Sequence, residues 1–314
     1  MIYFGKETFY VKSEMESTFS YQYHFVLITE EVGNDYWHLI ENGAQEEAEL
    51  QNVYLEYVGP TRSNNEEKLE ILDRMISAHV DGIIVPGIPG EQFNNLVKKA
   101  VDIGIPIITI DGDAPTSERD VYVGTDNYLA GVLAGQTLVA ETKGEQYVGV
   151  VVGTFDAPNQ KLRLEGFKDA IEKETRIHLV EVVESNITEI GAIDATYSLM
   201  KKYPQMNAFF GATALDGVGI VQGVEEMMPK NAPYIIAFDT LPQTLDLIEQ
   251  GKIQATIAQN PTEMGRQAVS SLIRVLNKEK VNRLQYTETS VIHKGDIKNG
   301  EIIPLEADHE VNKR

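Results

Sequence analysis

Short apolar runs alternate with longer amphipathic stretches along most of the chain. The runs are rich in β-branched residues, and many are apolar on both faces, which is typical of parallel strands that helices cover above and below. The predicted strands are residues 24–29, 53–58, 80–85, 105–110, 148–152, 179–183, 207–211, 234–238 and 255–258.

The stretches between these strands repeat apolar residues at helical spacing. In residues 64–79, Leu69, Leu72 and Ile76 recur at intervals of three and four, while acidic residues occupy the other faces. The other predicted helices are residues 36–51, 90–103, 127–142, 159–174, 190–203, 215–228, 241–250 and 263–276. Strands and helices that alternate this many times predict an α/β fold with parallel sheets.

One segment, residues 105–127, divides the pattern into two similar halves. It holds two short strands with turn residues between them, and a second set of strand–helix units begins at Asn127. The length of 314 residues agrees with this division, because single hydrophobic cores stop growing near ~250–300 residues. We therefore expect two lobes, each built on a doubly wound parallel sheet.

Composition narrows the classes of partner. The chain has 27 basic and 48 acidic side chains, and its formal net charge of −21 repels phosphate backbones and anionic lipid surfaces. A neutral ligand is therefore favoured over nucleic acid. No apolar run approaches the eighteen or more residues that span a bilayer. The absence of cysteine excludes disulfides, thiolate metal sites and cysteine nucleophiles.

The first residues carry no apolar core of the signal-peptide type, so we expect an export signal or anchor to be missing from this sequence. Residues 1–22 are predicted to form an N-terminal extension or a juxtamembrane linker.

The residues that follow the predicted strands are the candidates for function, since ligands of parallel α/β sheets sit beyond the carboxyl ends of the strands. These positions are mostly polar or aromatic. Carboxylates and amides pair with sugar hydroxyls, a guanidinium group supplies a fork of donors, and aromatic rings cover sugar C–H faces. The candidates are Glu30, Asn34, Tyr36, Trp37, Asp111, Arg163, Asn186, Thr213, Asp239 and Gln259.

Most of these residues also have a purely structural explanation. Asp111 and Asp239 could cap turns, as Asx residues at strand ends often do. Tyr36 and Trp37 could be core aromatics, and Arg163 could lie on a helix surface. Several such residues at equivalent strand ends are nevertheless hard to explain as independent turn chemistry.

The sequence lacks the common catalytic and metal-binding motifs. It contains no Gly-x-Ser-x-Gly elbow, Walker phosphate loop or His-Glu-x-x-His pair, and its six histidines show no metal-ligand spacing. We therefore expect neither a cofactor nor a metal.

From about residue 23 to 295, the sequence resembles the periplasmic sugar-binding proteins of the ribose-binding type, a family that includes the sugar-sensing cores of lactose-repressor-like regulators. The order and spacing of several motifs carry this resemblance. These motifs are NDYWHLIENGAQEEAE (34–49), IPIITIDGD (105–113), YVGTDNYLAGVLAG (122–135), RLEGF (163–167) and FDTLPQTLDLIEQGKIQATIAQNPTEMG (238–265).

The resemblance implies two doubly wound lobes joined by a three-strand hinge, the type I arrangement. The N-terminal lobe would comprise residues 23–125 and 259–288, and the C-terminal lobe residues 126–258 and 289–300. Residues 301–314 would form a tail.

The resemblance also assigns roles by position. Tyr36 and Trp37 would sandwich the sugar ring, with Asn34 beside them and Asp111 accepting from hydroxyls. The second lobe would close with Arg163, Thr213 and Asp239, with Gln259 at the hinge. The chain departs from the pattern at Gly112, where the family has Arg, and at Thr213-Ala214, where it has Asn-Asp. Glu30 would then be an additional acceptor, and a pentose such as arabinose or a hexose is a more plausible ligand than ribose.

The leading hypothesis is a non-catalytic, extracytoplasmic sugar-binding protein, located in the periplasm or on the outer face of the membrane. It would close around a monosaccharide and present the closed form to an ABC import permease or a membrane sensor kinase. The alternative is a sugar-processing enzyme that uses Asp111 and Asp239 as an acid–base pair. A DNA-binding regulator is disfavoured, because the 22 residues before the first strand contain only two basic residues.

Overall fold

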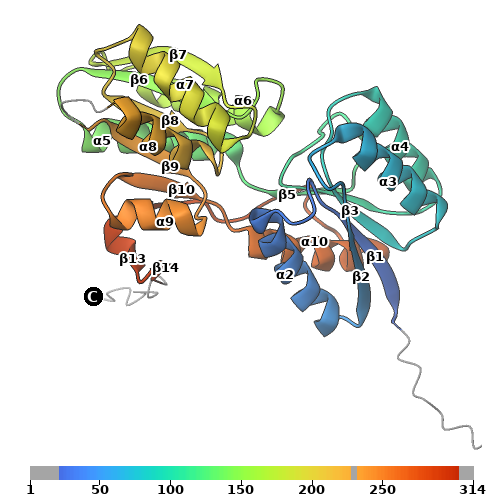
Figure 1. Ribbon diagram of the computed structural model, residues 1–314. Helices are drawn as coiled ribbons and strands as arrows, with labels where there is room; N and C mark the ends of the chain where they lie inside the picture. The colour runs from blue at the N-terminus through green and yellow to red at the C-terminus, as the bar shows by residue number, and fades with distance from the viewer. Residues whose placement is uncertain (1–20, 228–231, 304–314) are drawn as a thin grey trace, which may run out of the picture.

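The computed structural model describes residues 21–227 and 232–303, which form two α/β lobes (Figure 1). The N-terminal sheet has the order β11-β5-β4-β3-β1-β2, and all its strand pairs are parallel. Its strands are β1 (Tyr23–Ile28), β2 (Val53–Val58), β3 (Gly82–Pro86), β4 (Ile107–Ile110), β5 (Val121–Gly124) and β11 (Leu284–Tyr286).

The C-terminal sheet repeats this topology with the order β12-β10-β9-β8-β6-β7, and only its β10–β12 pair is antiparallel. Its strands are β6 (Gln146–Val152), β7 (Ile177–Glu184), β8 (Ala208–Gly211), β9 (Tyr234–Phe238), β10 (Ala255–Ala258) and β12 (Ser290–His293). Matching the two orders makes β4 equivalent to β9 and β5 equivalent to β10. The predicted pair of parallel-sheet lobes is confirmed.

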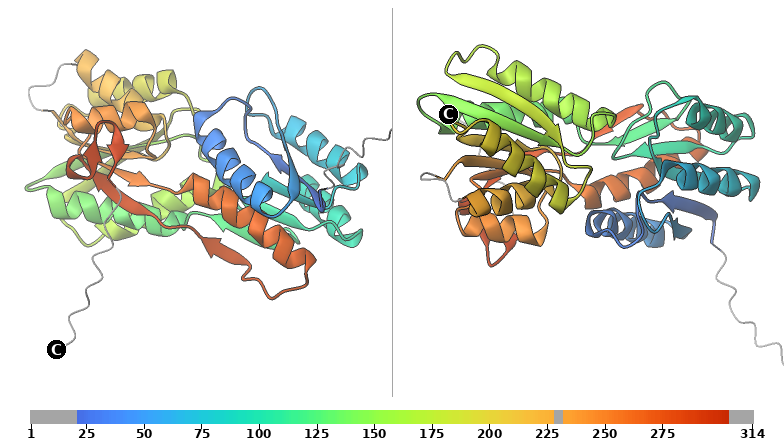
Figure 2. Two further views of the ribbon diagram at one scale, coloured as in Figure 1. Left: turned by 90° about the horizontal axis from the view of Figure 1, so that it is seen from below. Right: turned by 45° about the horizontal axis from the view of Figure 1, so that its top comes forward.

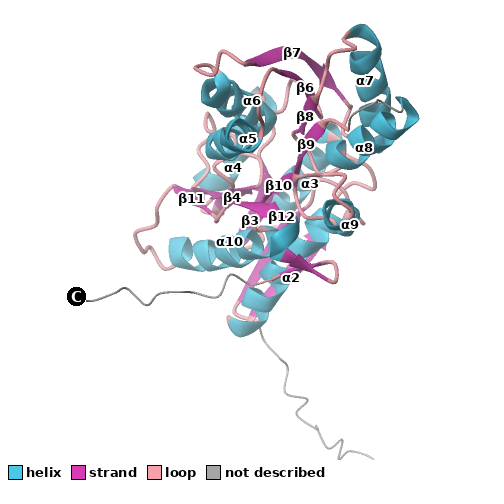
Figure 3. Ribbon diagram, turned by 90° about the vertical axis from the view of Figure 1, so that its left-hand side faces the viewer, coloured by secondary structure: helices cyan, strands magenta, loops and turns pink. Residues whose placement is uncertain are grey.

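Helices cover both faces of each sheet. In the N-terminal lobe, two helices pack on one face, α2 (Asp35–Leu50) and α10 (Pro261–Leu276), and two on the other, α3 (Asn65–Ser77) and α4 (Glu91–Asp102). In the C-terminal lobe, α5 and α6 lie on one side of the sheet and α7 and α8 on the other (Figure 3). The helices of this lobe are α5 (Asn127–Glu141), α6 (Pro158–Ile171), α7 (Glu189–Lys202), α8 (Asp216–Met227) and α9 (Pro242–Glu249).

The chain passes between the two sheets three times, from β5 to α5, from β10 to α10 and from β11 to β12 (Figure 2). The first two crossings lead directly into helices that side chains cap. The Asp126 carboxylate accepts from the Leu129 N–H, and the Asn260 side-chain oxygen accepts from the Glu263 N–H. Side-chain caps therefore fix the first turn of the helix that follows each of these two crossings.

Close helix packing depends on glycine at equivalent positions of the two lobes. A Cβ atom on Gly265 would lie 2.0 Å from the Ile40 carbonyl oxygen, so α10 and α2 touch through their backbones. A Cβ atom on Gly131 would lie 2.0 Å from the Arg163 carbonyl oxygen, which brings α5 equally close to α6. This contact fixes the backbone from which Arg163 projects.

The predicted helices and strands are found within a few residues of their expected bounds, and the structure adds short elements near the C-terminus. Residues 301–302, expected to begin a tail, form β14 (Glu301–Ile302), which pairs antiparallel with β13 (Ile297–Lys298). Ile302 packs against the core of the C-terminal lobe. The predicted extension, residues 1–22, lies outside the described residues apart from Tyr21 and Gln22.

No helix in residues 21–227 or 232–303 combines the length and the apolar character needed to cross a bilayer.

Candidate functional site

Two aspartates occupy equivalent positions at the carboxyl ends of equivalent strands, Asp111 after β4 and Asp239 after β9. Both have left-handed backbones, with φ of 61° and 67°. This conformation costs a non-glycine residue about 1 kcal/mol or more, and such strain clusters at functional sites.

The next strand in each lobe holds its aspartate in place. The Asp111 N–H donates to the Val123 carbonyl at 3.1 Å, and the Tyr122 hydroxyl donates to the Asp111 carbonyl at 2.9 Å. In the other lobe, the Asp239 N–H donates to the Ile257 carbonyl at 2.8 Å, and the Thr256 hydroxyl donates to the Asp239 carbonyl at 2.7 Å. Both aspartates therefore have their backbone N–H and carbonyl fixed by the neighbouring strand in the same manner.

Tyr36, in the first turn of α2, binds the carboxylate of the N-terminal lobe. Its hydroxyl donates to the Asp111 Oδ1 atom at 2.7 Å. Burial raises the pKa of the Tyr36 hydroxyl well above its usual value, and the carboxylates of Asp111 and Asp239 raise it further. One carboxylate from each lobe therefore acts electrostatically on the Tyr36 hydroxyl. This indicates that the carboxyl ends of β4 and β9 lie close together.

Arg163, on α6, is the central cation of the site and only 3% exposed. Its guanidinium group donates to the Asn127 Oδ1 atom at 2.8 Å and to the Ala212 carbonyl at 2.8 Å. Its Cζ atom lies 3.7 Å from the centroid of the Phe238 ring, a cation–π contact. These partners hold the planar fork in one orientation, so Arg163 is not the helix-surface residue that the sequence allowed.

Gln259 links the two crossings to the site. Its Oε1 atom accepts from the Thr125 hydroxyl at 2.5 Å and from the Arg163 guanidinium at 3.2 Å. Its Nε2 atom donates to the Asp239 Oδ1 atom at 2.7 Å. Thr125 and Gln259 are the residues that follow the equivalent strands β5 and β10. The hinge and the site therefore share one hydrogen-bond network.

Burial shapes the electrostatics of both aspartates. It raises the pKa of Asp239 to about 6, against the opposing effect of the Arg163 guanidinium and of the Gln259 hydrogen bond. Burial also raises the pKa of Asp111, against Arg163 and the Tyr36 hydrogen bond. A single guanidinium thus stabilises the charged forms of carboxylates from both lobes.

The other predicted residues are placed differently. The Thr213 hydroxyl is buried, its interaction with the Asp216 carboxyl lowers the pKa of that group, and the Thr213 N–H donates to the same carboxylate at 2.9 Å. Asn34 caps α2, because its Oδ1 atom accepts from the Tyr36 and Trp37 N–H groups at 3.0 and 3.3 Å. Thr213 therefore retains hydrogen-bonding capacity, whereas the Asn34 oxygen is occupied.

Trp37, Asn186 and Glu30 make no hydrogen bond to Tyr36, Asp111, Arg163, Asp239 or Gln259 in the described part of the chain. Trp37 is 4% exposed in the apolar core of the N-terminal lobe, with its ring edge-on to Tyr36. Asn186 is exposed in the β7–α7 turn with a φ of 54°. Glu30 accepts hydrogen bonds from Ser63 and Lys68. The structure thus gives each of the three a local structural role.

Sequence reasoning missed two polar residues of this network, Thr125 and Asn127, and it also missed the buried Lys68, which pairs with Glu30. Thr125 directly follows β5 and Asn127 is the first residue of α5, where both resemble ordinary residues of a helix start. Lys68 occupies a buried position of α3, four residues before Leu72. A charged residue on the apolar stripe of a helix was the one sequence signal that could have revealed it.

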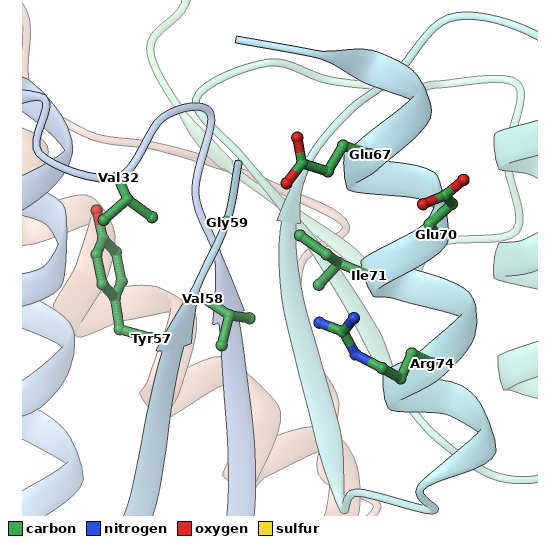
Figure 4. A pocket seen from close by; sticks show the side chains of 8 residues that line it. All are labelled: Val32, Tyr57, Val58, Gly59, Glu67, Glu70, Ile71 and Arg74. Carbon is green, nitrogen blue, oxygen red and sulfur yellow. The ribbon is translucent and has the colours of Figure 1, made fainter. Parts of the chain in front are cut away.

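A separate pocket of about 410 Å³ lies at the end of β2 (Figure 4). Glu67, Ile71 and Arg74 project from α3 on one side, and Val32 and Tyr57 lie on the other. The lining includes none of the ten predicted residues. No group of three or more His, Cys, Asp or Glu side chains with the geometry of a metal site occurs among the described residues.

Comparison with known proteins agrees with this fold and site. A model of the periplasmic binding protein domain matches residues 25–280. The ribose import binding protein RbsB of Escherichia coli K12 is 24% identical over 255 residues, which cover 81% of this chain and 85% of the relative.

Two solved structures have higher sequence identity to this chain than RbsB has. GanP, a glucose-galactose binding protein from Geobacillus stearothermophilus, has 45% sequence identity and a TM-score of 0.85, over 88% of this chain and 98% of GanP. A chain of the XylFII–LytSN complex has 34% identity and a TM-score of 0.82, over 88% of this chain and all of that one. The protein therefore belongs to the periplasmic binding protein domain family.

Proposed function

We propose that this protein binds one monosaccharide, a pentose or a hexose, between its two lobes. The observation that carries the proposal is that Arg163 stabilises the charged forms of Asp111 and Asp239, which belong to different lobes. Carboxylates that accept and a guanidinium that donates match the hydroxyls of a sugar, each of which can do both. A sugar that bonded to all three would hold the lobes together.

The direct ligand contacts in this proposal are Tyr36, Asp111, Arg163, Thr213, Asp239 and Gln259. The Thr213 hydroxyl is buried beside the Asp216 carboxyl, and its oxygen can still accept from a sugar hydroxyl. The ring of Tyr36 would cover one sugar face, and Trp37 would support that ring from the core. Asn34 would act by fixing the first turn of α2.

Sugar would shift an open–closed equilibrium, because only the closed form presents both lobes to it. The closed form would be recognised by a membrane partner on the outer side of the cell membrane, either an ABC import permease or a sensor kinase. The import setting is supported by the RbsB relatives and by an arabinose-bound ABC transporter solute-binding protein from Burkholderia graminis with 25% identity. The alternative, a membrane partner other than a permease, is supported by the similarity to a chain of the XylFII–LytSN complex.

Catalysis by Asp111 and Asp239 is less consistent with these observations. The relatives are binding proteins by name, and the Asp239 carboxylate already accepts from Gln259 in a network that fixes it. A binding protein uses such fixed groups for ground-state recognition.

Isothermal titration calorimetry against a panel of pentoses and hexoses tests the proposal. We expect one-to-one, saturable binding of at least one sugar with a dissociation constant on the order of micromolar, which corresponds to ~8 kcal/mol. The recovered sugar should be chemically unchanged. The proposal is wrong if no sugar in the panel gives heat, or if a sugar is consumed in a reaction that Asp239→Asn abolishes.

A further inference from the structure

Lys68 is an unusual lysine, because its side chain is only 2% exposed. It lies near the start of α3 among the buried residues Leu69, Ile71 and Leu72. Burying an ammonium group costs several kcal/mol unless it is paired and hydrogen-bonded. Its partner is Glu30, which follows β1 and also accepts a hydrogen bond from Ser63.

The Lys68–Glu30 pair lies beside the proposed sugar site. Glu30 follows β1 and α3 follows β2, so both residues lie at the carboxyl edge of the sheet, as Asp111 does. Both groups act on Asp111: Glu30 raises the pKa of its carboxyl, and Lys68 lowers it.

Among the described residues of the N-terminal lobe, the buried cationic side chains are Lys68 and Arg119, whereas Arg62 in the β2–α3 loop is exposed. Gly112 follows Asp111, so the chain offers no side-chain donor at that position. The Arg119 guanidinium is engaged with the Asp113 carboxylate, at 2.6 and 2.7 Å. An ammonium group has three N–H donors, and Glu30 is the one acceptor that the described residues place on Lys68.

We propose that Lys68 is a specificity-determining ligand contact, held by Glu30, that donates a hydrogen bond to one hydroxyl oxygen of the bound sugar. This inference rests on the proposed function. An ammonium group is a compact charge and serves a single acceptor, whereas a guanidinium fork serves two. The site therefore selects a sugar with a hydroxyl at one particular carbon, next to the hydroxyls that Asp111 accepts.

The test is a cycle between protein variants and deoxy sugars, followed by calorimetry. The parent sugar is the tightest binder of the panel, and its monodeoxy analogues each lack one hydroxyl. For the wild type, one analogue should bind about 10-fold or more weakly than the parent. Lys68→Met should bind the parent about 10-fold or more weakly, but lose little further affinity for that analogue. Its response to the other analogues should match the wild type.

Lys99→Met is the matched control, because Lys99 lies on the neighbouring helix in an exposed ion pair with Asp73. It should leave all affinities unchanged. Lys68→Gln keeps a neutral donor and should give the same analogue-specific pattern with a smaller loss of affinity. This variant replaces Lys68→Met in the test if Lys68→Met does not fold.

Two results would overturn the inference while leaving the proposed function intact. Lys68→Met could bind the parent as tightly as the wild type does. Alternatively, it could weaken the parent and every analogue by one common factor, which is the behaviour of a structural tether between α3 and β1. Absence of binding by the wild type would instead refute the proposed function, and this inference with it.

Discussion

Replacing Arg163 by Met is expected to weaken sugar binding by at least about 100-fold and to reduce the free energy of unfolding by about 2–4 kcal/mol. The guanidinium is buried, bonds to Asn127, Ala212 and Gln259, and stabilises the charged forms of Asp111 and Asp239. Met fills similar volume but leaves these acceptors unpaired. Calorimetric titration with the preferred sugar and urea unfolding at pH 7 measure the two effects.

Arg266→Met is the control for this substitution. Arg266 lies on α10 in partly exposed ion pairs with Glu46 and Glu263, and such pairs contribute at most about 1 kcal/mol. This variant should bind sugar as the wild type does. If Arg163→Met also retained the wild-type affinity within about threefold, Arg163 would not be a ligand contact and the proposed site would have to be abandoned.

Replacing Asp239 by Asn is expected to stabilise the free protein at pH 7 while weakening its sugar binding. The pKa of about 6 in the folded state lies above the ordinary value near 4, so between these pH values the folded protein binds more protons than the unfolded chain. This carboxyl therefore lowers the free energy of unfolding as pH rises from about 4 to 6, and the full cost is present above pH 6. Asn removes that cost and retains an oxygen that can accept from Gln259.

The expected gain in stability at pH 7 is at most about 3 kcal/mol, and it should vanish near pH 4. Sugar affinity should fall about 10- to 100-fold, because a neutral amide accepts more weakly than a carboxylate. Urea unfolding from pH 4 to 8 and calorimetry at pH 7 measure the two quantities. Asp194→Asn, at an exposed site on α7, is the control. A variant that is less stable than the wild type at pH 7 would contradict this account of burial.

The fold could be predicted from sequence because many of its strands are apolar on both faces and its helices repeat apolar residues along one face. The errors have local causes. Strand β4 begins at Ile107 and not at residue 105, because Pro106 has no N–H to donate to a neighbouring strand. The strands β11 and β12 are short and only partly buried, so they lack the apolar run that identified the others.

The site was only partly predictable, because strand-end position identifies a residue but not its partners. Arg163 lowers the carboxyl pKa of both Asp111 and Asp239, and the ligand-binding roles that the resemblance assigned to these three residues stay predictions. Trp37 faces the core, an outcome that the sequence left open. Thr125 and Asn127 could not be recognised, because their roles depend on Gln259 and Arg163, which are distant in the chain.

Hydrogen–deuterium exchange with and without the preferred sugar tests the central claim most directly, namely that one sugar is held by both lobes at once. The account predicts slower exchange at saturating sugar in the segments that follow the strands of each lobe. These segments are residues 29–37 and 111–116 in the N-terminal lobe, and residues 153–163 and 212–216 in the C-terminal lobe. Protection confined to one lobe, or to the separate pocket around Tyr57, would contradict it.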